Sequence, residues 1–213
     1  AKHGNKAISS SSGSANVLES LGIDINKSVA ASKSDIKNHN LGFMFAPSYH
    51  PAMQYAMNVR TDLKLKTVFN ILGPLCNPAS VKSQAMGTFD KNLTEIQAKV
   101  LKNLGSKNVM TFCSDEGLDE LTTTGKTKVT QFMNGGEIKS FELEPESIGL
   151  KRSNIEDLKG GTPDENAKII IEILKGAEGP KTDIVLLNAA AGIIVGGKAD
   201  NFQNAFKIAK LSI

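Results

Sequence analysis

The stretch from Gln84 to Cys113, QAMGTFDKNLTEIQAKVLKNLGSKNVMTFC, decides the fold. Its two ends read as short apolar strands, Gln84–Phe89 and Asn108–Cys113, and the segment between them reads as a helix over Leu93–Leu104. A strand, a helix and a second strand at this spacing indicate parallel pairing with a crossover helix. The stretch therefore predicts an α/β fold with a largely parallel sheet flanked by helices.

The ends of the central helix have their own signals. Asn92 can cap its start with Glu95 at the third helical position, and Gly105 can end it. Its apolar residues are spaced to share one face, which consists of Ile96, Val100 and Leu104. These features predict an amphipathic helix that packs on the sheet.

The remaining elements follow outward from this unit. Polar Ser9–Ser14, SSSSGS, reads as a loop, and Leu41–Ala46 reads as a buried strand. Asn134-Gly135-Gly136 separates two β-rich runs, Lys126–Met133 and Ile138–Leu143, which predicts a β-hairpin at a sheet edge. Helices are expected over Ala15–Gly22, Ala52–Leu63, Pro163–Lys175 (with a Thr162/Glu165 capping box), Asp183–Val195 and Asn201–Leu211.

Composition narrows the class of protein. The chain has 213 residues, 40% of them hydrophobic, which is enough for one domain with a sizeable core. Its net charge of +3 is too small to indicate nucleic-acid binding. Cys76 and Cys113 have no metal-ligand spacing and are expected to be buried thiols in a reducing compartment. With no apolar run of membrane-spanning length and no secretory signal, we expect a cytoplasmic protein without membrane contact.

Three segments carry candidate chemistry. The first is Lys2-His3-Gly4-Asn5 with the serine loop, because a cation, a glycine, an amide and hydroxyl groups can surround a phosphate. Composition alone favours an ordinary polar loop here. The second is Phe45–Pro78, in which a guanidinium, that of Arg60, offers two parallel N–H groups to a planar carboxylate.

The third segment is Glu116-Gly117-Leu118-Asp119-Glu120-Leu121, just after the strand that ends near Cys113. Ligands gather beyond the carboxyl ends of strands in α/β sheets, so this loop lies where a site is expected. Two adjacent carboxylates in a loop can both reach hydrated Mg²⁺. Acidic loops are more often simply solvated.

Together these segments resemble the anthranilate phosphoribosyltransferase family. Lys-His-Gly-Asn with its serine-rich continuation resembles a phosphoribosyl pyrophosphate-binding segment. Tyr49-His50-Pro51-Ala52-Met53, Asn58-Val59-Arg60 and Phe69–Pro78 resemble the site for the aromatic acid, and Gly-Leu-Asp-Glu resembles a metal-binding motif. The resemblance covers Lys2 to about Leu211. Lys6 stands where the family usually has Arg, and Ser11 where it often has Lys.

The resemblance implies roles for individual residues. Arg60 would anchor the anthranilate carboxylate, His50 would line the entrance, and the Gly73-Pro74 turn would present backbone to the ring. The phosphoribosyl pyrophosphate residues would be Lys2, Gly4, Asn5, Ser9 and Ser14. Mg²⁺ would be held by Asp119 and Glu120.

The implied reaction transfers a 5-phosphoribosyl group from phosphoribosyl pyrophosphate to anthranilate, a step of tryptophan biosynthesis. No strong general base is expected, because the attacking amine is uncharged at neutral pH. Residues 1–213 would form part of the family's α/β domain, since the family places a helical domain and a glycine-rich phosphate loop before Lys2. We therefore expect the isolated chain to be inactive and the full-length protein to be a homodimer.

Two alternatives remain at this point. A pyrimidine nucleoside phosphorylase would share the fold, but its phosphate motif differs from Lys2–Gly13. A non-catalytic nucleic-acid-binding relative would show tight, salt-sensitive DNA binding, for which the charge gives no support. Arg60→Ala separates all three, because only the transferase would lose binding of anthranilate.

Overall fold

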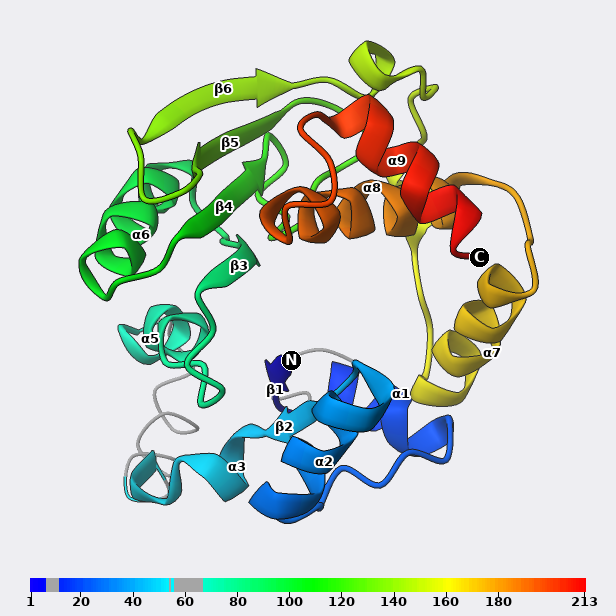
Figure 1. The fold of residues 1–213 in the computed structure, drawn as a ribbon. Helices are drawn as coiled ribbons and strands as arrows, with labels where there is room; N and C mark the ends of the chain where they lie inside the picture. Colours follow the sequence, from blue (N-terminus) through cyan, green and yellow to red (C-terminus); the bar gives the residue numbers. More distant parts are fainter. Residues whose placement is uncertain (7–11, 54, 56–66) are drawn as a thin grey trace. The chain divides into compact units, whose positions relative to one another are not determined.

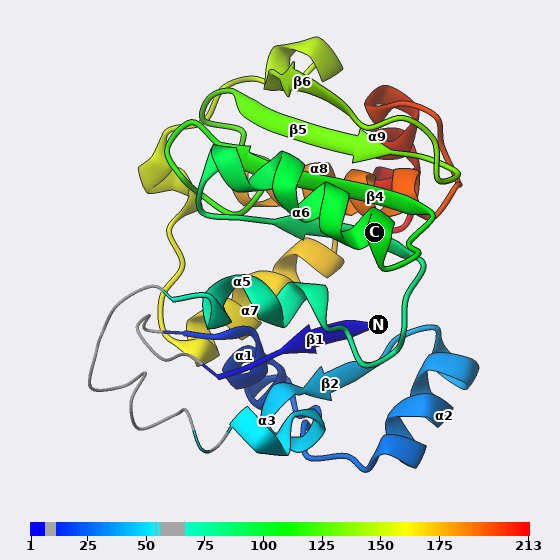
Figure 2. The ribbon, with the colours of Figure 1, turned by 90° about the vertical axis from the view of Figure 1, so that its left-hand side faces the viewer.

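The computed structural model describes residues 1–6, 12–53, 55 and 67–213, and its ribbon is shown in Figures 1 and 2. The chain forms two compact units. The first comprises Ala1–Val81 and Gly160–Ile171, and the second comprises Lys82–Lys159 and Glu172–Ile213. The helix expected over Ala52–Leu63 lies mostly outside the described residues.

The first unit contains a short parallel sheet. Strand β1 (Lys2–Gly4) pairs with β2 (Phe43–Phe45), with His3 opposite Met44. The strand predicted over Leu41–Ala46 is therefore confirmed. The helices described in this unit are α1 (Ser14–Ser20), α2 (Val29–His39), α3 (Ala46–Tyr49), the 3₁₀ turn η1 (Pro51–Met53), α5 (Phe69–Leu75) and the greater part of α7 (Pro163–Leu174).

The second unit is built on a four-stranded sheet in the order β3-β4-β5-β6. The strands are β3 (Ser83–Gly87), β4 (Asn108–Ser114), β5 (Thr127–Phe132) and β6 (Lys139–Leu143). Strands β3 and β4 are parallel, as the opening stretch predicts, whereas β5 and β6 are antiparallel additions. The α/β class and the edge hairpin are confirmed. This sheet is mixed because the hairpin contributes half of its strands.

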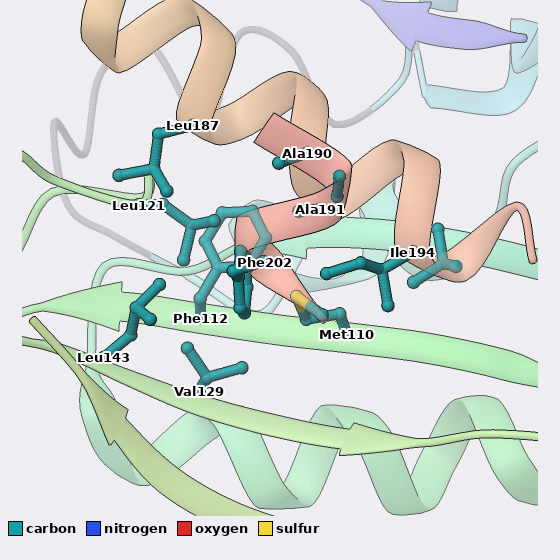
Figure 3. Packing of buried hydrophobic residues seen from close by; sticks show 12 residues of the cluster. Met110, Phe112, Leu121, Val129, Leu143, Leu187, Ala190, Ala191, Ile194 and Phe202 are labelled. Atoms are coloured by element: carbon teal, nitrogen blue, oxygen red, sulfur yellow. The ribbon is translucent and has the colours of Figure 1, made fainter. Parts of the chain in front are cut away.

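Helices cover both faces of this sheet. Helix α6 (Lys91–Asn103) packs on β4 and β5, and α8 (Pro180–Val195) packs on β3 and β4 from the other side (Figures 1 and 2). Helix α9 (Phe202–Leu211) packs on α8. Figure 3 shows Leu187 and Ile194 of α8 above Met110 of β4. Since α6 and α8 enclose β4, that strand is buried on both faces, as central strands of α/β sheets are.

Several local signals are confirmed at the level of atoms. Asn134 and Gly135 take φ of 55° and 69°, the left-handed pair that a tight hairpin turn needs. At the start of α7, the Thr162 hydroxyl accepts from Glu165 N (3.3 Å), and Glu165 Oε2 accepts from Thr162 N (2.7 Å). The predicted capping box is therefore formed.

The start and the buried face of α6 differ from the prediction. Asp90, not Asn92, is the N-cap, and its carboxylate accepts from Asn92 N at 2.9 Å. Ile96 and Leu104 are 55% and 60% exposed. The buried positions are Thr94, Gln97, Ala98 and Leu101. Polar Thr94 can be buried because its hydroxyl donates to Lys91 O at 2.8 Å and accepts from the Thr130 hydroxyl at 3.1 Å.

The two cysteines differ in environment. Cys113 is buried as expected, but Cys76 is exposed, so the prediction for Cys76 was wrong. Among the described residues, no helix is both long and apolar enough to cross a membrane.

Candidate active site

The first candidate segment runs along β1 into the start of α1. Lys2 is exposed, and its backbone N–H donates to Gly42 O at 2.8 Å, which fixes the strand edge. Gly4 lies against the Phe43 ring, because a Cβ at Gly4 would come within 2.9 Å of that ring. The same Cβ would lie 3.5 Å from Ser14 Oγ, so β1 and the first residue of α1 meet at Gly4.

Asn5 continues this contact between the strand and the helix. Its carbonyl accepts from Ala15 N at 3.4 Å, and its side-chain oxygen accepts from Lys6 N at 2.8 Å. Lys2, Gly4, Asn5 and Ser14 therefore belong to one small region of the first unit. Ser9 and Ser11 lie outside the described residues.

Lys6, which stands where the family resemblance implies an arginine, has a partner of its own. Its ammonium group lies 2.9 Å from the Glu19 carboxylate of α1, with both side chains partly exposed. This ion pair neutralises the cation locally. Lys2, the other lysine of this segment, has no ion-pair partner among the described residues.

The second candidate segment meets the first through two histidines. The rings of His3 and His50 lie 4.8 Å apart, centroid to centroid, in an edge-on arrangement at 64°. The backbone of Gly73 also lies near His3, where it acts to raise the pKa of His3. Three pieces of sequence, around residues 3, 50 and 73, therefore converge in this unit.

This environment changes the acidity of His3. Partial burial lowers the pKa of His3, and the nearby His50 lowers it further, while the backbone of Gly73 acts in the opposite direction. The Nε2 atoms of both rings are buried and have no hydrogen-bond partner among the described residues. His3 therefore favours the neutral state, in which one ring nitrogen is an acceptor and the other a donor.

Gly73 and Pro74 do not form the predicted turn. They lie inside α5, which ends one residue later at Leu75. The Gly-Pro dipeptide is typical of turns, and here Pro74, which has no N–H to donate to the preceding helical turn, stands one residue before the helix ends. Outside its chain neighbours and the backbone of its own helix, no described atom lies within 4 Å of a Cβ placed at Gly73, so this position presents bare backbone to open space. Arg60 lies outside the described residues.

The third segment belongs to the second unit and follows β4, as expected. The loop turns back on Ser114: Leu118 N donates to Ser114 Oγ (2.9 Å), and Ser114 N donates to Leu118 O (3.0 Å). A Cβ at Gly87 would lie 1.6 Å from the carbonyl oxygen of Asp119. The end of β3 therefore supports the loop through backbone contact.

The carboxylates of this loop fall into two pairs. Asp115 forms an ion pair with Lys91, and Glu116 accepts from the Thr124 hydroxyl at 2.9 Å. Asp119 and Glu120 are both exposed. All four side chains are exposed, so solvent reaches each of these carboxylates.

Asp119 and Glu120 suit one kind of ion. They supply hard oxygen donors in an open loop, which fits Mg²⁺ with several of its waters retained. Among the described residues, no three His, Cys, Asp or Glu side chains gather into a metal-binding group. The described residues therefore do not form a site in which protein ligands enclose the metal. A hydrated Mg²⁺ site needs only the adjacent pair, Asp119 and Glu120.

Sequence reasoning missed Gly87 and Asn188. Gly87 ends a strand, where a glycine can mark a close backbone approach. Asn188 is the sole polar residue between Ile184 and Val195 of α8, and it bonds the backbone of Leu121 beside the acidic pair. A lone amide in an apolar helix was a usable signal, but its partner is 67 residues away in sequence.

Comparison with known proteins decides the family. The model of the glycosyl transferase family, a/b domain, matches residues 1–213, which is the whole chain. The chain belongs to this family. Its members among curated relatives include the anthranilate phosphoribosyltransferase of Clostridium kluyveri, 50% identical over 203 residues that cover 95% of this chain and 60% of the relative. The Methanosarcina barkeri enzyme of the same name is 47% identical over 213 residues, covering 100% of this chain and 58% of the relative.

Solved structures of family members agree with the fold. The anthranilate phosphoribosyltransferase of Thermus thermophilus superposes with a TM-score of 0.90 at 39% identity, covering 99% of this chain and 62% of that chain. The Saccharomyces cerevisiae enzyme in complex with PRPP and Mg superposes with a TM-score of 0.89 at 30% identity, covering 100% and 60%. The chain spans about 60% of the length of the curated relatives named above.

Proposed function

We propose that the protein transfers the 5-phosphoribosyl group of phosphoribosyl pyrophosphate to anthranilate. The products are N-(5-phosphoribosyl)anthranilate and pyrophosphate. Two relatives that are 47–50% identical to nearly all of this chain carry the name of this activity. A yeast relative of 30% identity has been solved with PRPP and Mg, and in another structure with 4-fluoroanthranilate.

The observation that carries the proposal is the convergence of His3, His50 and Gly73. It joins the segment proposed for the phosphoribosyl donor to the segment proposed for the aromatic acid. A transferase needs its two substrates side by side, and much of its rate can come from their alignment. The neutral His3 ring and the bare backbone at Gly73 suit a flat, uncharged aromatic surface.

The phosphate side is proposed to rest on Lys2, Gly4, Asn5 and Ser14, with Ser9 from outside the described residues. Lys2 offers an ammonium group with no ion-pair partner among the described residues, and Gly4 brings the backbone of β1 against the Phe43 ring and close to Ser14. Charge-assisted hydrogen bonds from such groups are about twice as strong as neutral ones. The donor's phosphates would be oriented and partly neutralised by this region.

The proposed metal residues are Asp119 and Glu120. When bound, Mg²⁺ supplies charge stabilisation to the departing pyrophosphate. The two carboxylates would hold the hydrated ion, and the Ser114 and Gly87 contacts would hold the backbone of the loop that carries them. Asp115 and Glu116, which are bound by Lys91 and Thr124, are assigned no role in metal binding.

The proposed chemistry is a substitution at the anomeric carbon of ribose. The bond from this carbon to pyrophosphate breaks, the bond to the anthranilate nitrogen forms, and the amine then loses one proton to solvent. Arg60 would hold the substrate carboxylate through paired N–H groups, and Asn5 would help to orient the reactants. No residue is required to remove the proton before attack, because the amine is already neutral.

A direct assay tests the proposal. The protein, expressed from its complete gene, is incubated with anthranilate, phosphoribosyl pyrophosphate and Mg²⁺, and the loss of anthranilate fluorescence is followed. We expect turnover that needs all three, and a loss of anthranilate binding of at least about 10-fold in Arg60→Ala, as removal of a charged hydrogen bond predicts. Phosphorolysis of pyrimidine nucleosides, or salt-sensitive DNA binding without turnover, would instead support one of the alternative functions.

We also propose that the protein acts as a homodimer, as its resemblance to the family implies. Light scattering during size-exclusion chromatography of the protein measures this directly. A monomer at assay concentration would contradict the proposal.

A further inference from the structure

Asn188 makes an unusual set of hydrogen bonds from inside an apolar helix. Its Oδ1 accepts from Leu121 N at 3.0 Å, and its Nδ2 donates to Leu121 O at 2.8 Å and to Ile184 O at 2.9 Å. Both N–H bonds of the amide and its oxygen are therefore used. The side chain pairs with the N–H and C=O of one residue, as a neighbouring strand does in a sheet.

The residue held in this way adjoins the acidic pair. Leu121 directly follows Glu120, and its side chain is fully buried beside Leu187 (Figure 3). The N–H group that donates to Asn188 Oδ1 belongs to the peptide bond between Glu120 and Leu121. Fixing this peptide plane restricts the backbone from which the Glu120 carboxylate projects.

The pair is fixed from two other directions as well. On the N-terminal side, Ser114 holds Leu118 through two hydrogen bonds. Beneath the loop, the Asp119 carbonyl occupies the space that a Cβ at Gly87 would fill. The backbone of Asp119 and Glu120 is therefore pinned before, below and after the pair, and Asn188 supplies the last of these contacts.

We propose that Asn188 is a positioning residue for the Mg²⁺ site at Asp119 and Glu120. This inference rests on the proposed function, because it presumes that the pair binds the metal. Asn188 does not touch the metal. It holds the exposed carboxylates in one arrangement, so that binding the ion does not have to order the loop.

Residues that orient metal ligands affect affinity strongly, and their removal typically weakens metal binding about 10- to 100-fold. The decisive variant is Asn188→Leu, which keeps a similar side-chain volume and removes all three hydrogen bonds. If it does not fold, Asn188→Ala removes the same bonds without adding atoms.

Asn108 offers a matched control. This asparagine lies at the opposite end of β4 from the acidic loop, and it also makes three hydrogen bonds, to Ser83 Oγ (3.2 Å), Val195 O (3.1 Å) and Asn134 N (2.8 Å). Asn108→Leu therefore removes an equal number of bonds from the same unit. It leaves the support of Leu121 intact.

The experiment measures Mn²⁺ binding by electron paramagnetic resonance in the protein without substrates, since Mn²⁺ accepts the same oxygen ligands as Mg²⁺. Thermal unfolding of each variant is recorded in parallel. We expect Asn188→Leu to raise the Kd for Mn²⁺ at least about 10-fold. We expect Asn108→Leu to change it less than about 2-fold although both variants lose stability. In turnover assays, Asn188→Leu should raise the Mg²⁺ concentration needed for half-maximal rate more than it lowers the rate at saturating Mg²⁺.

A third variant, Asp119→Asn, separates the two ways in which the idea can fail. If Asp119→Asn weakens Mn²⁺ binding but Asn188→Leu behaves like Asn108→Leu, Asn188 is only structural and the inference is wrong. If Asp119→Asn leaves Mn²⁺ binding unchanged, the metal assignment within the proposed function is wrong, and the inference falls with it.

Discussion

The carbonyl oxygen of Asp119 occupies the place where the side chain of residue 87 would begin. An ideal Cβ at Gly87 would lie 1.6 Å from that oxygen and 2.3 Å from the Asp119 carbonyl carbon. Backbone atoms cannot yield to such a contact as the end of a flexible side chain can. The position of the acidic loop therefore depends on the absence of a side chain at the end of β3.

Gly87→Ala should displace the acidic loop and destabilise the protein. Overpacking of this kind costs about 1–3 kcal/mol in the free energy of unfolding. Urea unfolding followed by circular dichroism measures the change. Gly192→Ala is a suitable control, because Gly192 lies in α8, no described atom outside its own helix turn lies within 4 Å of a Cβ placed there, and alanine favours a helix by about 1 kcal/mol. Equal stability of the two variants would contradict the close contact.

The two cysteines should react at very different rates with a thiol reagent. Cys76 is exposed, whereas Cys113 is 1% exposed, and burial raises the pKa of the Cys113 thiol. Because the thiolate is the reactive form, the native protein should release one equivalent of thionitrobenzoate quickly and the second only after denaturation. Cys76→Ser should remove the fast phase, and Cys113→Ser should keep it. Two fast equivalents in the native protein would show that β4 is open to the reagent.

Much of the fold was predictable because local sequence and tertiary structure agree. The Asn134-Gly135 turn and the Thr162/Glu165 box specify backbone conformation within a few residues, and both form as expected. The buried face of α6 was not predictable in this way. The hydroxyl of Thr94 is buried there because it accepts a hydrogen bond from Thr130 of β5, which hydrophobic periodicity does not detect.

The candidate site likewise has parts that the local sequence predicts and parts that it does not. Its motifs could be recognised because each is a continuous run, such as Lys2-His3-Gly4-Asn5 or Leu118-Asp119-Glu120. The contacts that support these motifs join distant parts of the chain. Asn188 reaches Leu121, and Gly87 reaches Asp119. The local sequence can draw attention to Asn188 and Gly87, but it does not show which residue each of them contacts.

The stability of the protein should depend on pH through His3. Burial, and then the proximity of His50, lowers the pKa of His3 in the folded state below its ordinary value of 6.5. The unfolded chain therefore takes up this proton first as the pH falls. The contribution of His3 is fully present above about pH 6.5 and is lost as the pH falls from there through the folded pKa.

Urea unfolding of the wild type and of His3→Gln at pH 7.5 and 5.5 measures this contribution. The wild type should lose more stability between the two pH values than the variant does. His39→Gln, at the exposed C-terminal end of α2, is the matched control and should follow the wild type. If His3→Gln and the wild type lose equal stability, the neutral state of His3 is not favoured by folding.

Lys2 and Lys6 allow a comparison of two cations in one short segment. Lys6 is paired with Glu19, whereas Lys2 has no ion-pair partner among the described residues and is proposed to bind phosphate. A hydrogen bond to a charged group is worth about 1.5–3 kcal/mol, which corresponds to roughly 10- to 100-fold in binding. Lys2→Ala should therefore raise the KM for phosphoribosyl pyrophosphate by at least about 10-fold, and should leave the KM for anthranilate nearly unchanged.

Lys6→Ala should have a much smaller effect on the same constant. It removes an exposed ion pair, which contributes about 0–1 kcal/mol to stability, and it also frees the Glu19 carboxylate. Steady-state kinetics at saturating anthranilate compare the two variants, and a change of less than about 5-fold is expected for Lys6→Ala. If Lys6→Ala raises the KM for phosphoribosyl pyrophosphate more than Lys2→Ala does, the Lys6–Glu19 pair opens when phosphate binds. Lys6 then has the role of the arginine that the family resemblance implies at this position.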